Sequence, residues 1–307
     1  MITIGFDTSN YTTSIAYFDG VDGVNCSQLL PVKEGQLGLR QSDALFSHIK
    51  SLPALSGRLF SHVQGKPIQA VGVSTRPRAV EWSYMPCFLA GISQAKLLSD
   101  ALRVPMFEFS HQQGHVAASL WSSGRMDLMD APHLAWHLSG GTTELLLVEP
   151  EGKNVRCTKI GGTTDISAGQ LIDRTGQMLG QPFPSGKHLD ALSGQGRCET
   201  FFKVKCPGTE FSLSGVQNKV ETFHQEHQNA ADTAAYALRC VIYAVKCATV
   251  NACKHYPGLP VVFSGGVASN SMLRSEMDGF DAVFSPPQYA TDNAMGIAVL
   301  AHRMLED

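Results

Sequence analysis

Two histidines four residues apart, His111 and His115, are the residues whose types and spacing most directly suggest chemistry in this chain. On a helix, side chains at positions i and i+4 share a face, so both imidazoles can bind one metal ion. The run 104–109 predicts a short buried strand, and residues 116–121 continue as a small-residue helix. We therefore expect both histidines in the first turns of a helix, with a third metal ligand from elsewhere in the chain. The alternative is an ordinary helix pair, one histidine buried and one solvated.

A metalloprotease with this spacing carries a glutamate directly after the first histidine as its general base. Gln112 occupies that position here and cannot take a proton, which disfavours a peptidase. His133 and His137 are also four residues apart, but we expect them on a strand, where this spacing spans roughly 13 Å. They are not predicted to bind a common ion.

The composition is typical of a globular protein large enough for two domains, with 307 residues, 43% of them hydrophobic and 17% charged. A net charge of −3 favours no general affinity for nucleic acid, so any such contact would need a local basic patch. The eight cysteines include no Cys-x-x-Cys pair, and Cys240 and Cys247 are interpreted as reduced core residues. No stretch approaches the roughly 20 apolar residues of a membrane span, and no leader segment is recognised, so we expect a cytoplasmic protein without membrane contact.

The elements that must position the histidines alternate between strands and helices. Residues 2–10 and 12–19 predict a hairpin with a polar turn, and residues 133–148 repeat this device about 130 residues later. Helices are expected at 44–59 and 86–102, with a strand at 68–74 between them. This pattern indicates two homologous lobes, each a mixed sheet flanked by helices, with a polar hairpin turned toward a cleft.

The second half of the chain repeatedly places small polar turns before helices. A turn at 161–165 leads into a helix at 168–179, a turn at 183–190 opens another, and a small-residue loop at 211–215 precedes a helical region at 229–255. A buried strand at 259–264 then delivers a Ser-Gly-Gly turn, and residues 291–294 cap the last helix. Bare glycine backbone admits a ligand closely, and helix N-termini favour anions.

The order of these motifs resembles the TsaD family, also known as O-sialoglycoprotein endopeptidases. Its members transfer a threonylcarbamoyl group from an adenylate to N6 of the adenosine beside the anticodon of tRNAs. The resemblance spans nearly the whole chain and is carried by His111-Gln-Gln-Gly-His115, Leu138-Ser-Gly-Gly-Thr142, Asp173, Gly186, Phe211-Ser-Leu-Ser-Gly215, Ser264-Gly-Gly266 with Asn270, and Thr291-Asp292-Asn293. It implies an α/β protein with the actin-like ATPase (ASKHA) fold, in which two duplicated lobes hold a nucleotide between them. Residues 1–115 and 292–307 would form the first lobe with the metal site, and residues 116–291 the second lobe with most nucleotide-binding turns.

Carried over by position, the resemblance implies that His111, His115 and Asp292 bind one iron(II) or zinc ion and carry the catalysis. Because Asp292 is distant in sequence, the last helix would have to return to the first lobe. An adenine nucleotide (threonylcarbamoyl-AMP, ATP or ADP) would be held by Ser139, Gly140, Gly141, Thr142, Asp173, Gly186, Asp190, Ser264, Gly265, Gly266 and Asn270. The implied partners are tRNA, a smaller TsaD-like paralogue and a P-loop ATPase. Three protein ligands would leave positions on the ion for oxygens of the donor, whose carbonyl it would polarise.

Several positions depart from the family pattern. The family's Glu-Thr-Ser-Cys-Asp-Glu-Thr reads Asp7-Thr8-Ser9-Asn10-Tyr11-Thr12-Thr13 here, so Tyr11 and Thr12 replace an acidic pair. Thr142 replaces a histidine, Gln170 replaces a glutamate, and Arg76-Pro77-Arg78-Ala79 replaces Gly-Pro-Gly-Leu.

Three functions therefore stay open. The first is a threonylcarbamoyl transferase acting on tRNA, with Arg76 and Arg78 at its phosphates. The second is a paralogous carbamoyl transferase with another acceptor, and the third is a non-catalytic nucleotide-binding subunit. A sugar kinase of the same fold would not explain the two histidines. Taken singly, Asp292 and Asn270 could also be helix caps, and Asp173 and Asp190 solvated helix residues.

Overall fold

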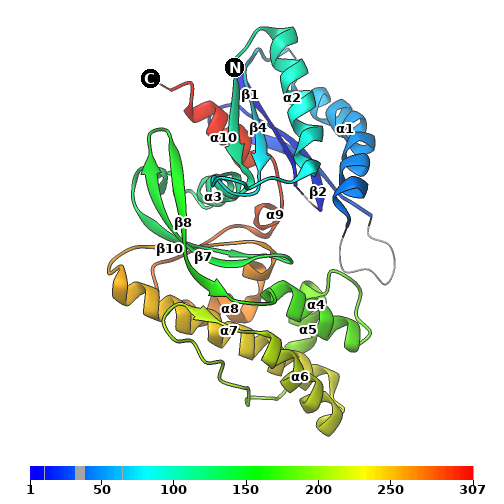
Figure 1. Ribbon diagram of the computed structural model, residues 1–307, viewed down its shortest axis with the longest axis vertical. Coiled ribbons are helices and arrows are strands. Elements are labelled where there is room, and N and C mark those ends of the chain that lie inside the picture. Colours follow the sequence, from blue (N-terminus) through cyan, green and yellow to red (C-terminus); the bar gives the residue numbers. More distant parts are fainter. Residues whose placement is uncertain (10, 32–38, 64, 307) are drawn as a thin grey trace. The chain divides into compact units, whose positions relative to one another are not determined.

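The computed structural model describes residues 1–9, 11–31, 39–63 and 65–306, and the chain divides into two compact units (Figure 1). Unit 1 comprises Met1–Ala131, Glu149–Cys157 and Asp292–Asp307, and unit 2 comprises Pro132–Val148 and Thr158–Thr291. The boundary predicted at residue 115 falls inside a continuous helix, α3 (His111–Ser122). This helix packs against the start of α10 (Met295–Arg303), where Gly296 approaches Gly114 and Ala118, and residues 116–131 belong with unit 1.

Unit 1 is built on a five-stranded sheet in the order β3-β2-β1-β4-β5. Its strands are β1 (Ile2–Thr8), β2 (Thr12–Phe18), β3 (Gly23–Leu29), β4 (Ile68–Arg76) and β5 (Met106–Ser110). β1, β4 and β5 run parallel, so their carboxyl ends meet at one edge. The remaining elements are α1 (Gln41–Val63), η1 (Pro86–Phe88), α2 (Leu89–Leu102) and η2 (Met126–Asp130), together with α3 and α10.

The alternation of side chains along β1 sorts its residues between two helical layers. Ile2, Ile4 and Phe6 enter an apolar core with α1 and α2. Thr3 and Gly5 face α10: the Thr3 hydroxyl donates to the Ala298 carbonyl oxygen at 2.8 Å, and a Cβ on Gly5 would lie 2.6 Å from the Ala298 nitrogen. The same alternation places Asp7 on the side of α10 and α3, which is the side of the two histidines.

Unit 2 contains a six-stranded sheet in the order β11-β10-β6-β7-β8-β9. Its strands are β6 (His133–Leu138), β7 (Thr143–Glu151), β8 (Asn154–Thr163), β9 (Glu210–Phe211), β10 (Val261–Ser264) and β11 (Ala282–Phe284). The ends of β7 and β8 within Glu149–Cys157 group with unit 1. The helical elements are α4 (Ala168–Met178), α5 (Gly186–Ser193), α6 (Ser214–His227), α7 (Ala230–His255), η3 (Gly266–Ser269), α8 (Ser271–Glu276) and α9 (Pro287–Ala290).

The two sheets have the same internal order, which confirms the predicted repeat. The sequence β3-β2-β1-β4-β5 in unit 1 corresponds to β8-β7-β6-β10-β11 in unit 2. Both repeats open with an antiparallel hairpin whose last pair encloses four residues, Thr8 with Thr13 and Leu138 with Thr143. In both, the first strand then pairs in parallel with the later one, β4 or β10.

Two helices differ from the sequence expectation. Helix α6 was not predicted, because its buried apolar side chains are only Val216 and Val220, too few for a recognisable stripe. Helix α7 is the one helix in the described part of the chain that is long and apolar enough, by length and composition alone, to cross a membrane, a candidate that the sequence analysis did not single out. Of its most apolar window, 67% is buried inside the protein, where it forms the core of unit 2 with Trp136 and Phe263.

Candidate metal centre and nucleotide-binding turns

The start of α3 is fixed by a capping box, which sets the position of His111. The Ser110 hydroxyl accepts from the Gln113 backbone nitrogen at 3.2 Å, and the Gln113 side chain accepts from the Ser110 nitrogen at 2.9 Å. The Gln113 amide nitrogen also donates to the Val155 carbonyl oxygen at 2.8 Å. The helix therefore begins at His111, and the prediction that both histidines lie in its first turns is confirmed.

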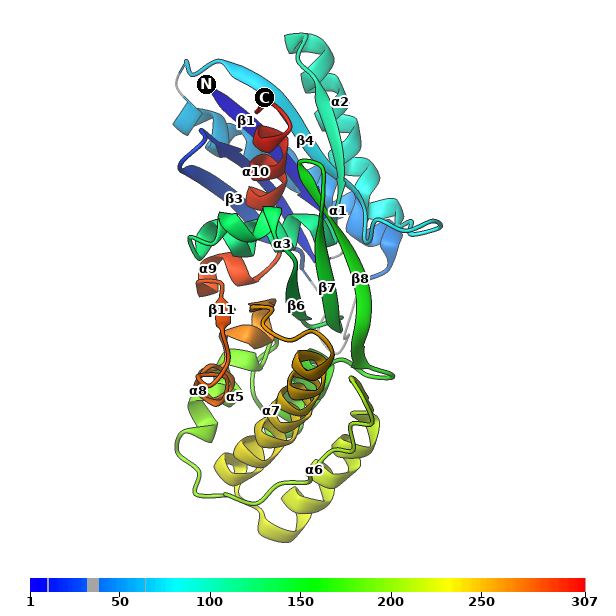
Figure 2. The ribbon, with the colours of Figure 1, turned by 90° about the vertical axis from the view of Figure 1, so that its left-hand side faces the viewer.

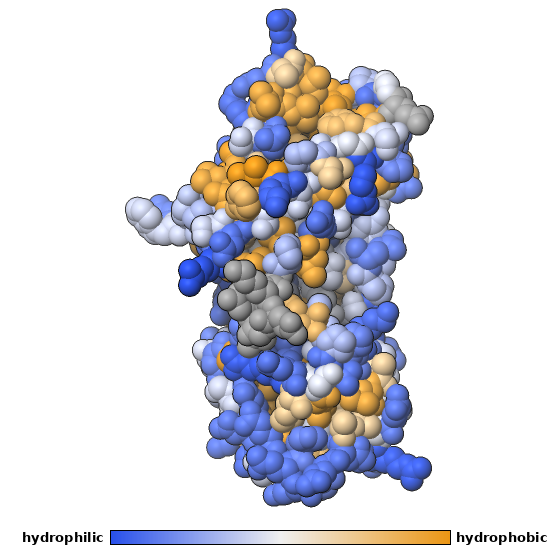
Figure 3. Space-filling view, turned by 90° about the vertical axis from the view of Figure 1, so that its right-hand side faces the viewer, coloured by the Kyte–Doolittle hydropathy of each residue, from blue (hydrophilic) through white to orange (hydrophobic). Residues whose placement is uncertain are grey.

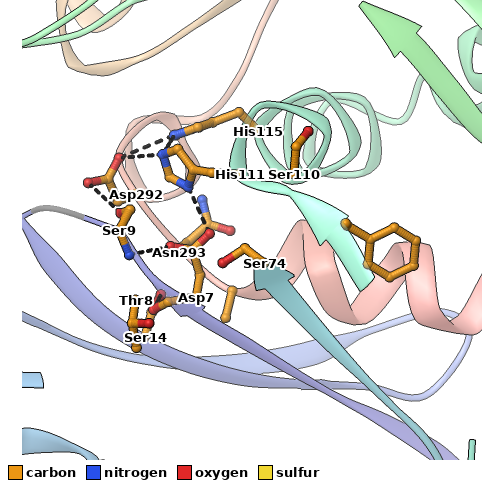
Figure 4. Close-up of polar contacts among 12 residues, drawn as sticks. Asp7, Thr8, Ser9, Ser14, Ser74, Ser110, His111, His115, Asp292 and Asn293 are labelled. Carbon is orange, nitrogen blue, oxygen red and sulfur yellow. Dashed lines mark hydrogen bonds and ion pairs between the residues drawn. The ribbon is translucent and has the colours of Figure 1, made fainter. Parts of the chain in front are cut away.

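Three side chains, His111, His115 and Asp292, converge in unit 1 (Figure 4). The two imidazole Nε2 atoms are 3.0 Å apart, and Asp292 Oδ1 lies 3.2 Å from the His115 Nε2 atom and 3.5 Å from that of His111. Asp292 reaches them because residues 292–307 pack in unit 1, as the return of the last helix required. The cluster is half-buried, with side-chain exposures of 14%, 4% and 21% for His111, His115 and Asp292.

These separations fit one ion. Ligand atoms placed about 2.0 to 2.2 Å from a common metal, at angles near 90° to 110°, lie about 2.8 to 3.6 Å from one another. Two imidazole nitrogens facing each other beside a carboxylate are also a donor set used for iron and zinc. The cluster is thus a group that could hold a metal ion.

Asp7, at the end of β1, is a member of this site that sequence reasoning missed. Its Oδ2 lies 2.7 Å from His111 Nδ1, and its side chain is 1% exposed. Ser9 connects the two carboxylates: its backbone nitrogen donates to Asp7 Oδ1 at 3.0 Å, and its hydroxyl donates to Asp292 Oδ2 at 3.3 Å. The available signal was a carboxylate directly at the carboxyl end of the first strand.

The carboxylates dominate the electrostatics of this cluster. Burial lowers the pKa of His111, but Asp7 and Asp292 outweigh burial and raise it to about 10. Burial likewise raises the pKa of Asp292, but hydrogen bonds from His111 and His115 hold it well below its usual range. A metal ion binding here would therefore compete with a firmly held proton.

Asp292 does not cap helix α10, which was the alternative interpretation of this residue. The neighbouring Asn293 side chain accepts from the Met295 nitrogen at 3.1 Å at the start of α10, while Asp292 points to the histidines. Tyr11 and Thr12, which replace the acidic pair, lie at the start of β2, where the Tyr11 carbonyl oxygen accepts from the Leu30 nitrogen at 2.8 Å. Asn10 lies outside the described residues.

The predicted nucleotide-binding turns lie in unit 2, and two of them are adjacent. In the β6–β7 turn the Ser139 nitrogen donates to the Thr142 carbonyl oxygen at 2.8 Å. Gly265, which has φ of +90°, follows β10 and packs so closely that a Cβ would lie 2.5 Å from the Leu138 carbonyl carbon. A Cβ on Gly140 or Gly141 would meet no atom within 4 Å, and one on Gly266 would meet only Thr291 Cγ2, at 3.8 Å. Ser264, in contrast, is buried, and its hydroxyl donates to the Trp136 carbonyl oxygen at 2.8 Å. Together the two turns present exposed backbone at the carboxyl ends of neighbouring strands.

The other residues that were predicted to bind the nucleotide form hydrogen bonds at the N-termini of helices α5 and α8. Asp173 Oδ1 accepts from the Ser185 nitrogen at 2.7 Å, one residue before Gly186, and its pKa is raised by burial against that hydrogen bond. The Asn270 amide donates to Asp190 Oδ1 at 2.9 Å, and its oxygen caps α8 by accepting from Leu273 at 2.9 Å. Asp173 and Asp190 are therefore not simply solvated, and Asn270 is the cap that its alternative reading described.

Comparison with known proteins decides the family. Residues 43–299 match the family model of TsaD, tRNA N6-adenosine threonylcarbamoyltransferase. The chain belongs to the TsaD family. A protein of this name from Carboxydothermus hydrogenoformans is 32% identical over 270 residues, covering 84% of this chain and 78% of the relative. One from Sulfurihydrogenibium sp. is 29% identical, covering 100% of this chain and 91% of the relative. The TsaD family is one of transferases, so the chain is a transferase-family enzyme.

Solved structures agree on the fold. Full-length HypF in its phosphate- and nucleotide-bound form matches with a TM-score of 0.65 at 13% identity, covering 100% of this chain and 47% of HypF. This chain thus spans about half the length of HypF. Component A of the (R)-2-hydroxyglutaryl-CoA dehydratase of Acidaminococcus fermentans matches with a TM-score of 0.57 at 14% identity, covering 99% of this chain and 98% of that one. These neighbours have the actin-like ATPase fold, which confirms the predicted fold of this TsaD-family chain.

Proposed function

We propose that this protein transfers a threonylcarbamoyl group from threonylcarbamoyl-adenylate to N6 of the tRNA adenosine beside the anticodon, using one iron(II) or zinc ion. The observation that carries the proposal is the convergence of His111, His115 and Asp292, whose ligand atoms lie within 4.8 Å of one another, in a chain of the TsaD family. The relatives are named tRNA N6-adenosine threonylcarbamoyltransferases, which supports the transfer of a threonylcarbamoyl group to N6 of a tRNA adenosine.

The chemistry needs an activated carbonyl group, since the exocyclic amine of adenosine is a weak nucleophile. The bound ion would supply Lewis-acid polarisation of the donor carbonyl. The residues of the chain hold the site for it: Asp7 orients His111, and Ser9 orders the carboxylates of Asp7 and Asp292. The transfer forms the N6–carbonyl bond, breaks the bond between the carbonyl carbon and the adenylate oxygen, and releases AMP and a proton.

The adenylate is proposed to bind in unit 2, at the glycine turns after β6 and β10. A phosphate can approach the backbone closely at these turns, because Gly140, Gly141 and Gly266 have no side chain that would block it. The start of α4 lies beside this turn, because the Ser167 hydroxyl donates to the Gly140 carbonyl oxygen at 2.6 Å. The backbone N–H groups at the N-terminus of α4 would stabilise the negative charge of a phosphate bound at this turn.

The test combines metal content with product analysis. Purified protein is incubated with synthetic threonylcarbamoyl-AMP and an unmodified tRNA transcript, with and without the partner proteins, and the nucleosides are analysed by mass spectrometry. We expect modified adenosine and about one iron or zinc per chain, both lost in His115→Ala. The matched control is His62→Ala, an exposed histidine of α1, which should retain both. Unmodified tRNA in the presence of the partners would contradict the proposal.

A second candidate, a carbamoyl transferase with another acceptor, is favoured by one observation: Tyr11 and Thr12 stand where the family pattern has its acidic pair. Such an enzyme would bind the adenylate but show no salt-dependent affinity for tRNA. A non-catalytic subunit would instead keep its biological role in a His111→Ala variant.

We further propose a smaller TsaD-like paralogue and a P-loop ATPase as protein partners, acting in the cytoplasm. Apolar side chains gather over α1 and α2 on one face of unit 1 (Figure 3), among them Phe46, Ile49 and Leu97, with exposures of 63%, 56% and 67%. A helical face of this kind is suited to burial against another protein. All eight cysteines are free, as expected in a reducing compartment. Ile49→Asp should abolish co-elution with the purified paralogue, whereas Val250→Asp, on α7 of unit 2, should not.

A further inference from the structure

We infer that the loop between β4 and η1, residues 77–85, is an RNA-binding loop in which Trp82 stacks on an unpaired base of the substrate. The inference rests on the proposed tRNA-modifying function and assigns residues that hold the RNA. Figure 2 shows the segment that follows β4 as a narrow loop projecting away from the sheet.

The loop exposes aromatic rings that the hydrophobic effect would otherwise bury. Trp82 is 96% exposed and Tyr84 is 64% exposed, whereas Trp136 is fully buried. Trp82 also has a φ of +63°, a left-handed conformation that is costly for a bulky residue. An indole held outward on strained backbone lacks a structural purpose in unit 1 and indicates a ligand.

The chemistry around Trp82 favours a nucleic acid over a protein. An open hollow of about 390 Å³ is lined by Arg76, Ala79, Val80, Glu81, Trp82, Ser83 and Tyr84. Two exposed arginines, Arg76 at the end of β4 and Arg78 in the loop, stand against one carboxylate of the loop, Glu81, so the hollow and its rim carry a local positive charge in a chain of net charge −3. Aromatic faces interleaved with guanidinium groups are the combination that binds single-stranded nucleic acid by stacking and phosphate contact. The face over α1 and α2, in contrast, presents aliphatic and phenyl groups.

The start of the loop is hydrogen-bonded to the helix that carries the two histidines of the candidate metal centre. The Gln112 nitrogen, one residue after His111, donates to the Pro77 carbonyl oxygen at 3.0 Å. The Thr75 hydroxyl donates to the Phe109 carbonyl oxygen at 3.4 Å, and Arg76 pairs in register with Ser110. The loop therefore leaves the same sheet edge that carries Asp7 and His111. An RNA base stacked on Trp82 would belong to a strand that passes beside this edge.

The loop also has a defined internal shape. The Ser83 hydroxyl accepts from the Arg78 nitrogen at 3.0 Å, and the Ser83 nitrogen donates to the Val80 carbonyl oxygen at 3.3 Å. The hydrogen bonds close a compact turn that presents Trp82 at its tip. Because Trp82 makes the outer surface of this turn, its replacement should leave the fold intact.

The experiment titrates the full-length protein with a labelled anticodon stem–loop RNA and measures Kd by fluorescence anisotropy, with tryptophan quenching as a second readout. We expect Trp82→Ala to raise Kd about tenfold or more, because loss of one base–aromatic stack has effects of this size. Trp82→Phe should recover most of the affinity, and Arg78→Gln should reduce the dependence of log Kd on log salt by about one. The matched control is Phe46→Ala, which removes another exposed aromatic ring, on α1, and should bind RNA like the wild type.

The outcomes separate this inference from the proposed function. If Trp82→Ala binds the stem–loop like the wild type while the wild type modifies tRNA, the stacking role is wrong and the proposed function stands. If the wild type neither binds the RNA nor modifies tRNA, both are wrong. If free AMP quenches Trp82 fluorescence as strongly as the stem–loop does, the loop is a mononucleotide site and the RNA assignment is overturned.

Discussion

Asp7 and His111 form a 2.7 Å hydrogen bond that joins the end of β1 to the first turn of α3. An ionised carboxylate can only accept, so His111 Nδ1 carries the hydrogen and donates it to Asp7 Oδ2. Its Nε2 atom is thereby turned toward His115 and Asp292. The bond fixes which nitrogen of His111 is presented to a metal.

The first prediction is that Asp7→Asn weakens metal binding about 10- to 100-fold, the usual effect of losing a carboxylate behind a metal-binding histidine. Competition with a chelator of known affinity would measure it. Asp100→Asn is the control, since Asp100 is an exposed residue of α2 paired with Lys96. An unchanged metal affinity in Asp7→Asn would show that His111 is oriented by its helix alone.

The second prediction concerns the approach of α10 to α3. A Cβ on Gly296 would lie 2.7 Å from the Ala118 nitrogen and closer still to the Gly114 carbonyl oxygen. Gly296→Ala should therefore lower the free energy of unfolding by about 1 to 3 kcal/mol through overpacking, and reduce metal content by separating Asp292 from the histidines. Gly57→Ala is the matched control, because a Cβ there meets nothing within 4 Å in the middle of α1. It should raise the stability by up to about 1 kcal/mol. Urea denaturation compares the two, and equal effects would refute this account of α10.

The third prediction distinguishes Gly140, in the proposed phosphate turn, from Gly169, in the first turn of α4. Gly140 borders open space, so Gly140→Ala should leave the melting temperature unchanged but weaken binding of AMP or ADP, measured by calorimetry. Gly169 packs against that turn, with a Cβ placed 2.5 Å from Gly140 Cα, so Gly169→Ala should lower both stability and affinity. Full nucleotide affinity in both variants would place the nucleotide elsewhere.

The fourth prediction is a pH dependence of unit 2 that arises from Asp165. Burial raises the pKa of Asp165, but hydrogen bonds from Ser212, Leu213 and Ser214 outweigh burial and hold this pKa well below its usual range. Because the folded pKa is depressed, the stabilisation is complete above the unfolded pKa and is lost as the pH falls below about 4 toward the folded value. Thermal melts of wild type and Asp165→Asn should therefore differ most at pH 7, and the difference should shrink as the pH falls below about 4 and close only near the folded pKa. A difference that stays the same from pH 7 to the lowest pH at which the protein is folded would assign the effect to shape and not to charge.

Features that depend on local spacing could be predicted from the amino-acid sequence. The histidine pair and the repeated hairpins follow from periods of a few residues, and helix α3 and strands β1 and β6 lie where those periods predicted. The membership of Asp292 in the site came from resemblance alone, since no local pattern connects residues 177 positions apart.

The contacts between groups that are distant in sequence became known from the folded chain. Asp7 faces His111 because β1 alternates and α10 and α3 cover that side of the sheet. Helix α6, with two buried valines, and the lobe boundary at Ala131 likewise depend on packing partners that a local pattern does not contain. The physical reason is common to all of them: helix and strand periods are set by neighbouring residues, whereas the closeness of two carboxylates and two imidazoles is set by the packing of segments that are far apart along the chain.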